Sequence, residues 1–583
     1  MAAIKKFLLI VILAAVAAVC VALYASVHLT FKAQALEMDP EARIRNLDQA
    51  GALYPLNDSS YQQAGMTYLD RAANNLADVA QAKTDLEKAC EDFSRALRLN
   101  PGSPTGHFYY GKTLTLMRYL GLYVEDNPFQ ELQKAAHLAG SHQQMDLDIG
   151  ITLLSQWGAL SAEEKGFTEA LLQKSLLLED VATFEEVLNL WDLNIRDYAV
   201  MDRILPPSPT LLRAYGRFLG EKSLSLAARR KALAQAEALE YDLAWKDYES
   251  GQNFTKYGRL ADSADRFSSC LNRLKKIHFY SYLAGDPNVG VSIEKKTTLQ
   301  RTVSLELGKA KLEDNRNMAN AEGPLRDYLA LESNYDQVVN LESYLKEMRI
   351  VPETGVEQSV KNIHDLAFQV LLMFDLHKYR QIVSLGTQLQ HSLVVPDEQT
   401  KKDLSEIFQF VGDSYLKLDF VYESEAFYQK ALELTPKSLD VLFRLKKYYE
   451  RRNEAEKGRE VDRLLNEVLT AGNVLSQSRL LPKGTAYVQP LILNVNQKKV
   501  RLEFQFGTLP GNPQPLVSIF LNGRVYWEDY VAGKAVSLEL DAVEGINELQ
   551  MVAVNGPAAL TKVNFTPILT EERLLEGPFS GQK

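Results

Sequence analysis

Apolar residues recur every three to four positions over most of this chain, and near residue 484 they begin to alternate at every second position. The first spacing places apolar side chains along one face of an α-helix, and the second places them on one face of a β-strand. A third pattern opens the chain, because residues 7–27 are almost entirely apolar and carry no charge. The pattern therefore predicts a membrane-length helix, a long helical region and a small all-β domain.

The helical spacing is clearest in the segment 405–436. Large apolar, small and aromatic residues, an alanine and a proline follow one another there at fixed intervals: Phe408, Val411, Gly412, Tyr415, Ser424, Tyr428, Ala431 and Pro436. Small side chains let two antiparallel helices approach, an aromatic ring fills the gap between them, and a proline ends the second helix. This arrangement resembles the tetratricopeptide repeat (TPR), which implies an α-solenoid with a groove for partner proteins.

A second copy of this spacing lies near residue 100, at Ala89, Phe93, Ala96 and Pro101. We expect its first helix at residues 69–80 and the next repeat to begin at Pro104, with Gly111 at the small position.

The other repeats are eroded, but the helical period continues on both sides of two breaks. We expect a solenoid over 39–282 and 299–475, with 283–298 as a loop or hinge. The LPPSP break at 205–209 should end one helix and start another, with Ser208 as the cap. Further helices are expected at 129–140, 142–157, 162–178, 183–198, 208–220 and 224–249, with helix pairs in 251–281, 353–393 and 438–469 and helices at 299–313 and 320–348.

One match to an enzyme motif lies in this region. Residues 106–113, GHFYYGKT, fit the phosphate-loop pattern, in which Lys112 would reach nucleotide phosphates and Thr113 would hold magnesium. No strand pattern precedes the match, its interior residues are bulky, and the repeat already explains Gly111. We interpret the match as coincidence and keep an NTPase as a remote alternative.

The apolar run at 7–27 spans roughly 30 Å as a helix, the hydrocarbon thickness of a bilayer. Lysines in residues 1–6 and acidic residues after the run favour a cytoplasmic N-terminus, with 28–38 as a linker. We predict a single-pass anchor in a bacterial inner membrane, with most of the chain in the periplasm. The small-x-small sequence Ala33-Gln34-Ala35 leaves a cleaved signal peptide as the alternative.

The alternating pattern covers 484–567 and is followed by a tail at 568–583. Strands are predicted at 499–507, 535–540, 547–554 and 560–565, with a hairpin in 515–531 that turns at Asn522-Gly523. Short strands at this density are typical of a β-sandwich. The sequence VSIFLNG followed by a second alternating strand loosely resembles galactose-binding-like modules.

The hairpin also carries candidate glycan contacts. Strict alternation would place Tyr526 and Tyr530 on one face and Trp527 and Asp529 on the other. Aromatic rings beside a carboxylate could bind sugars, but aromatic strand residues more often pack in a core, and we favour packing.

The composition argues against several classes of function. The formal net charge is −10 and the pI is near 5.5, which argues against a nucleic-acid partner. The three cysteines, at 20, 90 and 270, give no zinc spacing, and no nucleophile–base arrangement, metal site or cofactor motif is visible. Clusters such as Lys446-Lys447 and Arg451-Arg452 are expected to be solvated helix faces. We therefore expect a binding protein, not an enzyme.

The leading hypothesis is a membrane-anchored, periplasm-facing TPR scaffold for partner proteins, with a groove between 405–436 and the preceding helices. An apolar anchor followed by eroded repeats resembles accessory proteins of bacterial surface-polysaccharide export, which implies a role in cell-envelope or exopolysaccharide assembly. The alternative is a carbohydrate-binding envelope protein that uses the β-sandwich.

Overall fold

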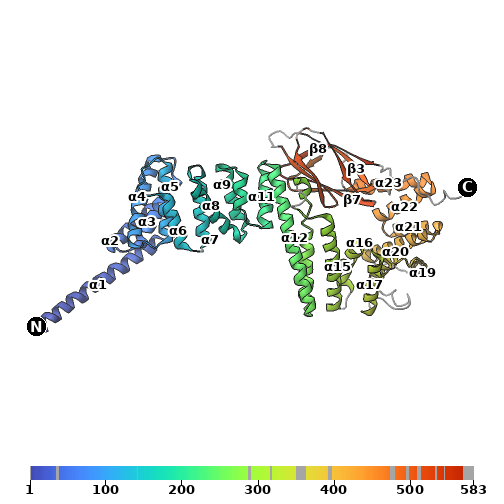
Figure 1. The fold of residues 1–583 in the computed structure, drawn as a ribbon, viewed down its shortest axis with the longest axis horizontal. Helices are drawn as coiled ribbons and strands as arrows, with labels where there is room; N and C mark the ends of the chain where they lie inside the picture. The colour runs from blue at the N-terminus through green and yellow to red at the C-terminus, as the bar shows by residue number, and fades with distance from the viewer. Residues whose placement is uncertain are drawn as a thin grey trace. The chain divides into compact units, whose positions relative to one another are not determined.

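The computed structural model in Figure 1 describes most of the chain and divides it into two compact units, Met1–Pro206 and Pro207–Lys583. The described residues are 2–34, 39–140, 142–285, 290–315, 318–348, 363–390, 397–472, 479–493, 498–507, 514–531, 533, 535–543 and 545–568. The boundary falls in the proline-rich break at 205–209, where Ser208 caps the next helix as expected. It does not fall at 283–298, the segment that the sequence suggested as a loop or hinge.

The physical reason is that helices on both sides of 283–298 share one core. Phe267 and Cys270, which precede this segment, are fully buried in the same apolar cluster as Leu299 and Val303, which follow it. A shared core joins the two sides into one packed body, whereas the two adjacent prolines at 206 and 207 interrupt the helical hydrogen bonds.

The N-terminal unit is entirely helical in the described residues, and its helices pack mainly against their neighbours in sequence. They are α1 (Ala2–Ala33), α2 (Pro40–Leu53), α3 (Asp58–Asn74), α4 (Val79–Leu99), α5 (Pro104–Tyr119), α6 (Pro128–Ala139), α7 (Gln143–Leu154), α8 (Ala162–Ser175), α9 (Val181–Asn194) and α10 (Tyr198–Ile204), with short 3₁₀ turns at Trp157–Ala159 and Leu176–Leu178.

The helix predicted at 69–80 is wrong. The chain breaks after Asn74, and α4 begins at Val79, where the Asp78 carboxylate accepts a hydrogen bond from a backbone N–H of the first turn. The small position of this helix pair is filled by Gly65 in α3, where an added Cβ would lie 3.0 Å from the ring of Phe93. The repeat therefore has a longer second helix than the spacing near residue 100 suggested.

The predicted linker at 28–38 is also wrong in its first part, because α1 continues without a break to Ala33. Ser26, Thr30 and Ala33 are buried against α2 and α3. Residues 35–38 lie outside the described residues.

The C-terminal unit continues the helix pairs and ends in strands. Its helices are α11 (Pro209–Glu221), α12 (Leu226–Lys256), α13 (Leu260–Leu274), α14 (Ser281–Ala284), α15 (Ile293–Asn315), α16 (Met318–Leu331), α17 (Tyr335–Glu347), α18 (Ile363–Asp375), α19 (Tyr379–Leu389), α20 (Glu398–Lys417), α21 (Val421–Leu434), α22 (Leu439–Arg452) and α23 (Ala455–Gly472). The helix expected at 224–249 runs on to Lys256, so the first half of the pair expected in 251–281 is the end of α12.

The segment 405–436 contains α21 and the part of α20 that follows Leu404. Their close approach depends on Gly412, because an added Cβ there would lie 2.6 Å from the ring of Tyr428. Phe408, Val411 and Ala431 are buried in the same core, and Ser424 is also buried.

The strands form two antiparallel sheets of four strands each in the described residues, with orders β1-β8-β3-β6 and β2-β7-β4-β5. The strands are β1 (Arg479–Leu481), β2 (Ala486–Leu493), β3 (Lys499–Gly507), β4 (Leu516–Leu521), β5 (Arg524–Tyr530), β6 (Ala535–Asp541), β7 (Gly545–Ala553) and β8 (Ala558–Ile568). Alternate residues of both sheets, such as Phe504 and Ile519, form one apolar core between them. The result is a β-sandwich that begins at least five residues before the predicted boundary at 484.

The predicted alternation along β5 is wrong at one point. The pairing of β4 with β5 shifts between Ile519 and Phe520, so that Ile519 pairs with Trp527 but Phe520 pairs with Val525. Such a bulge places two consecutive residues against one and reverses the alternation beyond it. Tyr526 therefore packs beside Trp527 on the sandwich core and does not share a face with Tyr530.

Candidate functional site

The sandwich meets the helices of the C-terminal unit in two places, and the first is a closed polar contact. The carboxylate of Glu528 in β5 accepts hydrogen bonds of 3.1 Å from both Nε and Nη2 of Arg229 in α12. The exposed fractions of these side chains are 7% for Arg229 and 0% for Glu528. Burial opposes the charge of Arg229, but the adjacent carboxylate outweighs it and raises the pKa of the guanidinium.

Neighbouring groups complete the hydrogen bonds of this pair. The Ser518 hydroxyl donates to Glu528 over 2.7 Å, and Arg229 donates to the carbonyl of Gly216. The backbone N–H of Val525 donates to the carbonyl of His278 over 2.9 Å, so a segment beside α14 bonds directly to β5. These contacts fix one edge of the sandwich on α12 and its neighbours.

Glu237 in α12 supports the same contact from the helix side. Its carboxylate accepts hydrogen bonds from the backbone N–H of His278 over 2.6 Å and of Tyr280 over 2.8 Å. Burial raises the pKa of Glu237 to about 7, although these two donors favour the charged form.

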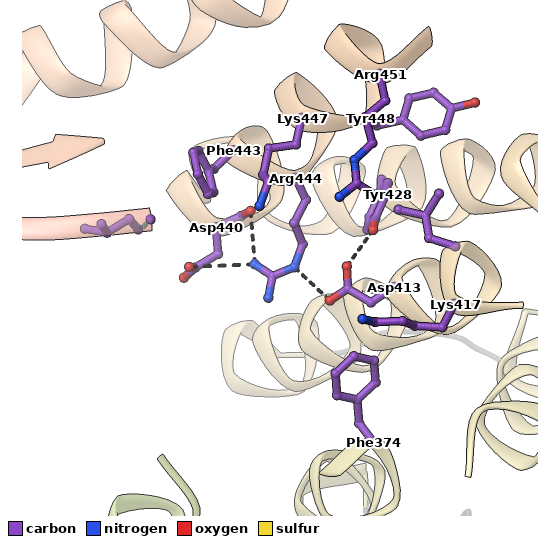
Figure 2. A pocket seen from close by; sticks show the side chains of 13 residues that line it. Phe374, Asp413, Lys417, Tyr428, Asp440, Phe443, Arg444, Lys447, Tyr448 and Arg451 are labelled. Atoms are coloured by element: carbon purple, nitrogen blue, oxygen red, sulfur yellow. Dashed lines mark hydrogen bonds and ion pairs between the residues drawn. The ribbon is translucent and has the colours of Figure 1, made fainter. Parts of the chain in front are cut away.

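The second meeting place is hollow. A cavity of about 700 Å³ opens between α18, α20, α21, α22 and the first residues of β7. Its lining side chains converge from these elements in Figure 2. They are Phe374, Asp413, Leu416, Lys417, Tyr428, Asp440, Phe443, Arg444, Lys447, Tyr448, Arg451, Gly545 and Ile546. This volume is within the range of ligand-binding cavities, about 300–1,000 Å³.

A hydrogen-bonded group forms the floor of this cavity. Asp413 accepts a hydrogen bond of 2.5 Å from the hydroxyl of Tyr428 and one of 2.8 Å from Nε of Arg444 (Figure 2). Burial and the charge of Asp413 both raise the pKa of Tyr428, so the phenol stays protonated and donates. Arg444 and Asp413 therefore neutralise each other inside the cavity.

The other charges around the cavity are mainly positive. Lys417, Lys447 and Arg451 surround the neutralised pair, against the single further carboxylate of Asp440. Lys417 and Arg451 are exposed, and no carboxylate among the described residues forms an ion pair with either of them. The cavity is thus positive within a chain whose net charge is −10.

The position of the cavity partly matches the groove expected between 405–436 and the preceding helices. Phe374 of α18 belongs to those helices, but most of the lining comes from α20 to α22 and from the sandwich. The clusters Lys446-Lys447 and Arg451-Arg452 are not simply solvated faces. In each cluster one residue forms an ion pair with a neighbouring carboxylate and the other lines the cavity. Lys446 pairs with Asp462 over 2.7 Å and Arg452 with Glu454, whereas Lys447 and Arg451 line the cavity.

Sequence reasoning missed the cavity because its lining comes from helices and a strand far apart in sequence. Lys447 and Arg451, four residues apart on one face of α22, were the only local signal.

Three of the candidate glycan contacts on the hairpin, Tyr526, Trp527 and Tyr530, make contacts within the protein. Trp527 lies edge-on to Phe504, with ring centroids 5.3 Å apart. The hydroxyl of Tyr526 donates to the carbonyl of Asp541, and that of Tyr530 donates to the carbonyl of Leu224. Asp529 pairs with Val517 across β4 and β5. Tyr526 and Trp527 therefore pack against the sandwich core while Tyr530 lies on the other face, and sugar binding by these residues stays a prediction.

The phosphate-loop match lies inside helix α5. Thr113 is buried and its hydroxyl donates to the carbonyl of Tyr109 over 2.8 Å, while Lys112 lies over the ring of Phe108. An added Cβ at Gly111 would lie 2.8 Å from Leu132 in α6, so this glycine serves helix packing. A regular helix does not present the curled backbone N–H groups that hold phosphate.

The second set of repeat residues lies beside this helix. Ala89, Phe93 and Ala96 are buried in α4, and the carbonyl of Pro101 in the following turn lies 3.0 Å from Nε2 of His107. Tyr415 and Pro436 complete the first set: Tyr415 stacks on Phe427, and Pro436 lies in the turn after α21. In the described residues, no group of three or more potential metal ligands comes together.

A comparison with family models supports one of the helix pairs of the N-terminal unit. A family model described as tetratricopeptide repeat matches residues 70–103. Similar solved structures include the P58(IPK) TPR domain, at 13% identity over 76% of this chain and 98% of that chain, with a TM-score of 0.15. They also include the structure of Naa15/Naa10 bound to HypK-THB, at 13% identity over 76% of this chain and 63% of that chain, with a TM-score of 0.23. At these scores no shared overall structure is defined. None of the curated proteins matches the sequence. The chain therefore carries a tetratricopeptide repeat at residues 70–103, within an array of helix pairs.

Proposed function

We propose that this protein is a membrane-anchored scaffold that binds a partner protein through the cavity between α18, α20, α21, α22 and β7. The observation that supports this most directly is the open, positively charged cavity in the best-preserved part of a TPR array. TPR arrays bind proteins by presenting such surfaces on stacked helix pairs.

Site-specific photocrosslinking tests this proposal. A photoreactive amino acid at Lys417, which is exposed at the cavity, should capture a discrete partner from intact membranes. The matched control is the same amino acid at Glu433, which is exposed on α21 and does not line the cavity. Equal capture at both positions, or at neither, would contradict the proposal.

The partner's identity also tests the pathway. We propose that it belongs to cell-envelope assembly, following the resemblance of an anchored, eroded TPR array to accessory proteins of surface-polysaccharide export. Capture of a partner without any role in the cell envelope would overturn this part of the proposal.

We further propose that α1 is retained as the anchor and is not removed as a signal peptide. Residues 10–33 form one helix that is long and apolar enough to cross a membrane, a property that a signal sequence shares. The last turns of α1, however, are bonded into the helices that follow. The Ser26 hydroxyl donates to the carbonyl of Ala50 over 2.7 Å, and the Asn57 amide donates to Ser26 over 2.8 Å and to Thr30 over 3.2 Å.

Cleavage at Ala33-Gln34-Ala35 would remove these partners. It would also leave Leu47 and Ala64 without Ala33, with which they form a small apolar core. The intact mass of protein purified from membranes should therefore include residues up to Ala33, and the protein should resist extraction by alkaline carbonate. A mature chain that begins after Ala33 would contradict retention.

The orientation is part of the proposal, with the N-terminus in the cytoplasm and the repeats in the periplasm. An alkaline phosphatase fused after Ile568 should then be active, because this reporter folds only outside the reducing cytoplasm. An inactive but full-length fusion would reverse the orientation.

A further inference from the structure

We infer that the turn between α2 and α3, residues 52–56, enters the surface of the lipid bilayer at the point where α1 leaves the membrane. The turn is then a second membrane contact, made by the folded part of the N-terminal unit. This inference rests on the proposed function, because it requires α1 to be retained as the anchor.

The direction of α2 is the first argument. Ala33, at the end of α1, forms a small apolar core with Leu47 of α2. Earlier in α1, the Ser26 hydroxyl donates to the carbonyl of Ala50, later in α2, over 2.7 Å. The two helices are therefore antiparallel, and α2 runs back toward the part of α1 that extends beyond the other helices in Figure 1. The turn after α2 lies at that end of the unit.

The level of the turn along α1 is the second argument. Leu53 follows Ala50 by three residues, about 4.5 Å along a helix, and so reaches the level of Leu23. Leu23 and Tyr24 are 40% and 75% exposed, whereas Ser26 is buried by the neighbouring helices. The lipid-facing part of α1 therefore ends near Tyr24, and tyrosine is common where a helix leaves the hydrocarbon. The turn meets the same boundary.

The third argument is the composition of the turn. Residues 49–57 carry no charge. Leu53 and Leu56 are 46% and 64% exposed, an arrangement that leaves two large apolar side chains in water unless a bilayer covers them. The first carboxylate after the turn, that of Asp58, accepts a hydrogen bond from the amide of Asn100 over 2.9 Å. The turn therefore offers lipid an apolar surface.

The backbone of the turn also suits a region with little water. The N–H of Tyr54 donates to the carbonyl of Ala50 over 3.1 Å, and the N–H of Asn57 donates to the carbonyl of Tyr54 over 3.0 Å. Pro55, between them, has no N–H. Backbone donors that are bonded within the protein lose little when they leave water, so this turn can approach the hydrocarbon at low cost.

The test places a tryptophan in the turn of the full-length protein, reconstituted into phosphatidylcholine vesicles. The emission that Leu56→Trp adds to that of the four natural tryptophans should be quenched by phosphatidylcholine brominated in the upper part of its acyl chains. The matched control is Leu76→Trp. Leu76 is a 41% exposed leucine in the turn at the opposite end of α3, about 25 Å away along the helix. The emission added there should not change with brominated lipid.

A second quencher tests the same positions from the aqueous side. Iodide, present on both sides of the vesicle membrane, should quench the emission added by Leu76→Trp and leave most of that added by Leu56→Trp. Both leucines are exposed, so the variants should retain the circular dichroism and melting temperature of the natural protein.

Equal quenching of the two variants by brominated lipid would overturn the inference. Emission at position 56 that neither quencher reaches would also overturn it, because protein, such as a second copy of the chain, would then cover the turn.

Failure of this inference is distinguishable from failure of the proposed anchor. Protein that resists alkaline carbonate, but in which iodide quenches the emission added by Leu56→Trp, would keep the anchor and lose only the second contact. Protein that carbonate extracts from the vesicles would remove both.

Discussion

Two arginine–carboxylate pairs lie where the sandwich meets helices of its own unit, and they differ in kind: one joins β5 to α12, and the other joins α22 to α20 beside the first residues of β7. At α12 the pair Arg229–Glu528 is sealed, with exposed fractions of 7% and 0%. At α22 the pair Arg444–Asp413 is partly open, with exposed fractions of 29% and 17%, and it is surrounded by further cations. The comparison teaches that the same kind of pair can be sealed within a contact or left partly open to solvent.

Burial decides between these two roles. A sealed ion pair has no access to solvent or to a partner, so its interaction free energy can only stabilise the contact in which it lies. A partly open pair is in contact with solvent, so its surroundings can also contact other molecules. On this view the α12 contact positions the sandwich, and the cavity at α22 is the surface that this positioning forms.

The largest expected effect comes from breaking the sealed pair. Glu528→Ala leaves the Arg229 guanidinium buried without its carboxylate, which should destabilise this contact by roughly 3–5 kcal/mol. Hydrogen exchange of the β5 backbone amides, which reports local opening, should speed up accordingly. The control is Glu539→Ala, since the Glu539–Arg501 pair is about half exposed and should change stability by less than about 1 kcal/mol. Equal effects of the two substitutions would contradict the assigned role.

The second effect concerns pH. Burial raises the folded-state pKa of Glu237 from 4.5 to about 7. Between pH 4.5 and pH 7 the folded protein therefore keeps a proton on this carboxylate that the unfolded chain has released. Stability should therefore be highest below pH 4.5 for this group and fall as pH rises to about 7, by on the order of 3 kcal/mol at most. Arg213 and Lys296 also act on this carboxylate, and both favour its charged form.

The measurement compares the natural protein with Glu237→Gln. The backbone N–H groups of His278 and Tyr280 donate hydrogen bonds to Glu237. Hydrogen exchange at these two amides should speed up from pH 5 to 7.5 by more than the exchange rate of an unprotected amide does. The glutamine variant should lose that excess. The cavity at α22 should show no matching change, and a parallel change there would indicate a global effect.

A smaller effect is expected at the helix packing that supports the cavity. Gly412→Ala places a methyl group where it would lie 2.6 Å from the ring of Tyr428. The ring must shift and weaken its hydrogen bond to Asp413, which should cost about 1–3 kcal/mol. Gly458→Ala in α23 is the control, because an added Cβ there would lie 4.0 Å from its nearest neighbour, the Cβ of Tyr449. The control should stabilise that helix by about 0.5–1 kcal/mol, as alanine does in a helix, and thermal melting separates the two.

The sequence predicts the helix pairs correctly at positions where close packing of two helices requires a small side chain. Gly412 with Tyr428 and Gly111 with Leu132 are close contacts in which a larger residue would clash, so their spacing persists in the sequence. The spacing failed near residue 69 because the small position there is filled by Gly65, farther from Phe93 than the usual interval. An insertion between two helices leaves each helix intact and therefore leaves no local signal.

The face assignments on β5 failed for a different reason. Alternation assumes regular pairing, and the bulge opposite Ile519 depends on β4 and not on β5 alone. Glu528, which looks like an ordinary solvent-facing residue in its strand, is fully buried because α12 supplies Arg229 from 299 positions away.

The sequence by itself determined the classes of element in this protein: an apolar helix at the N-terminus, helix pairs of TPR type and an antiparallel sandwich. These follow from periods of 3.6 and 2 residues and from small and large side chains at fixed spacing, which are local properties. Only the tertiary structure decided which charges are sealed and which remain open, because burial depends on neighbours that are distant in sequence. Arg229 and Arg444 are the same residue type on the same kind of helix, and only their surroundings make one pair sealed and the other partly open.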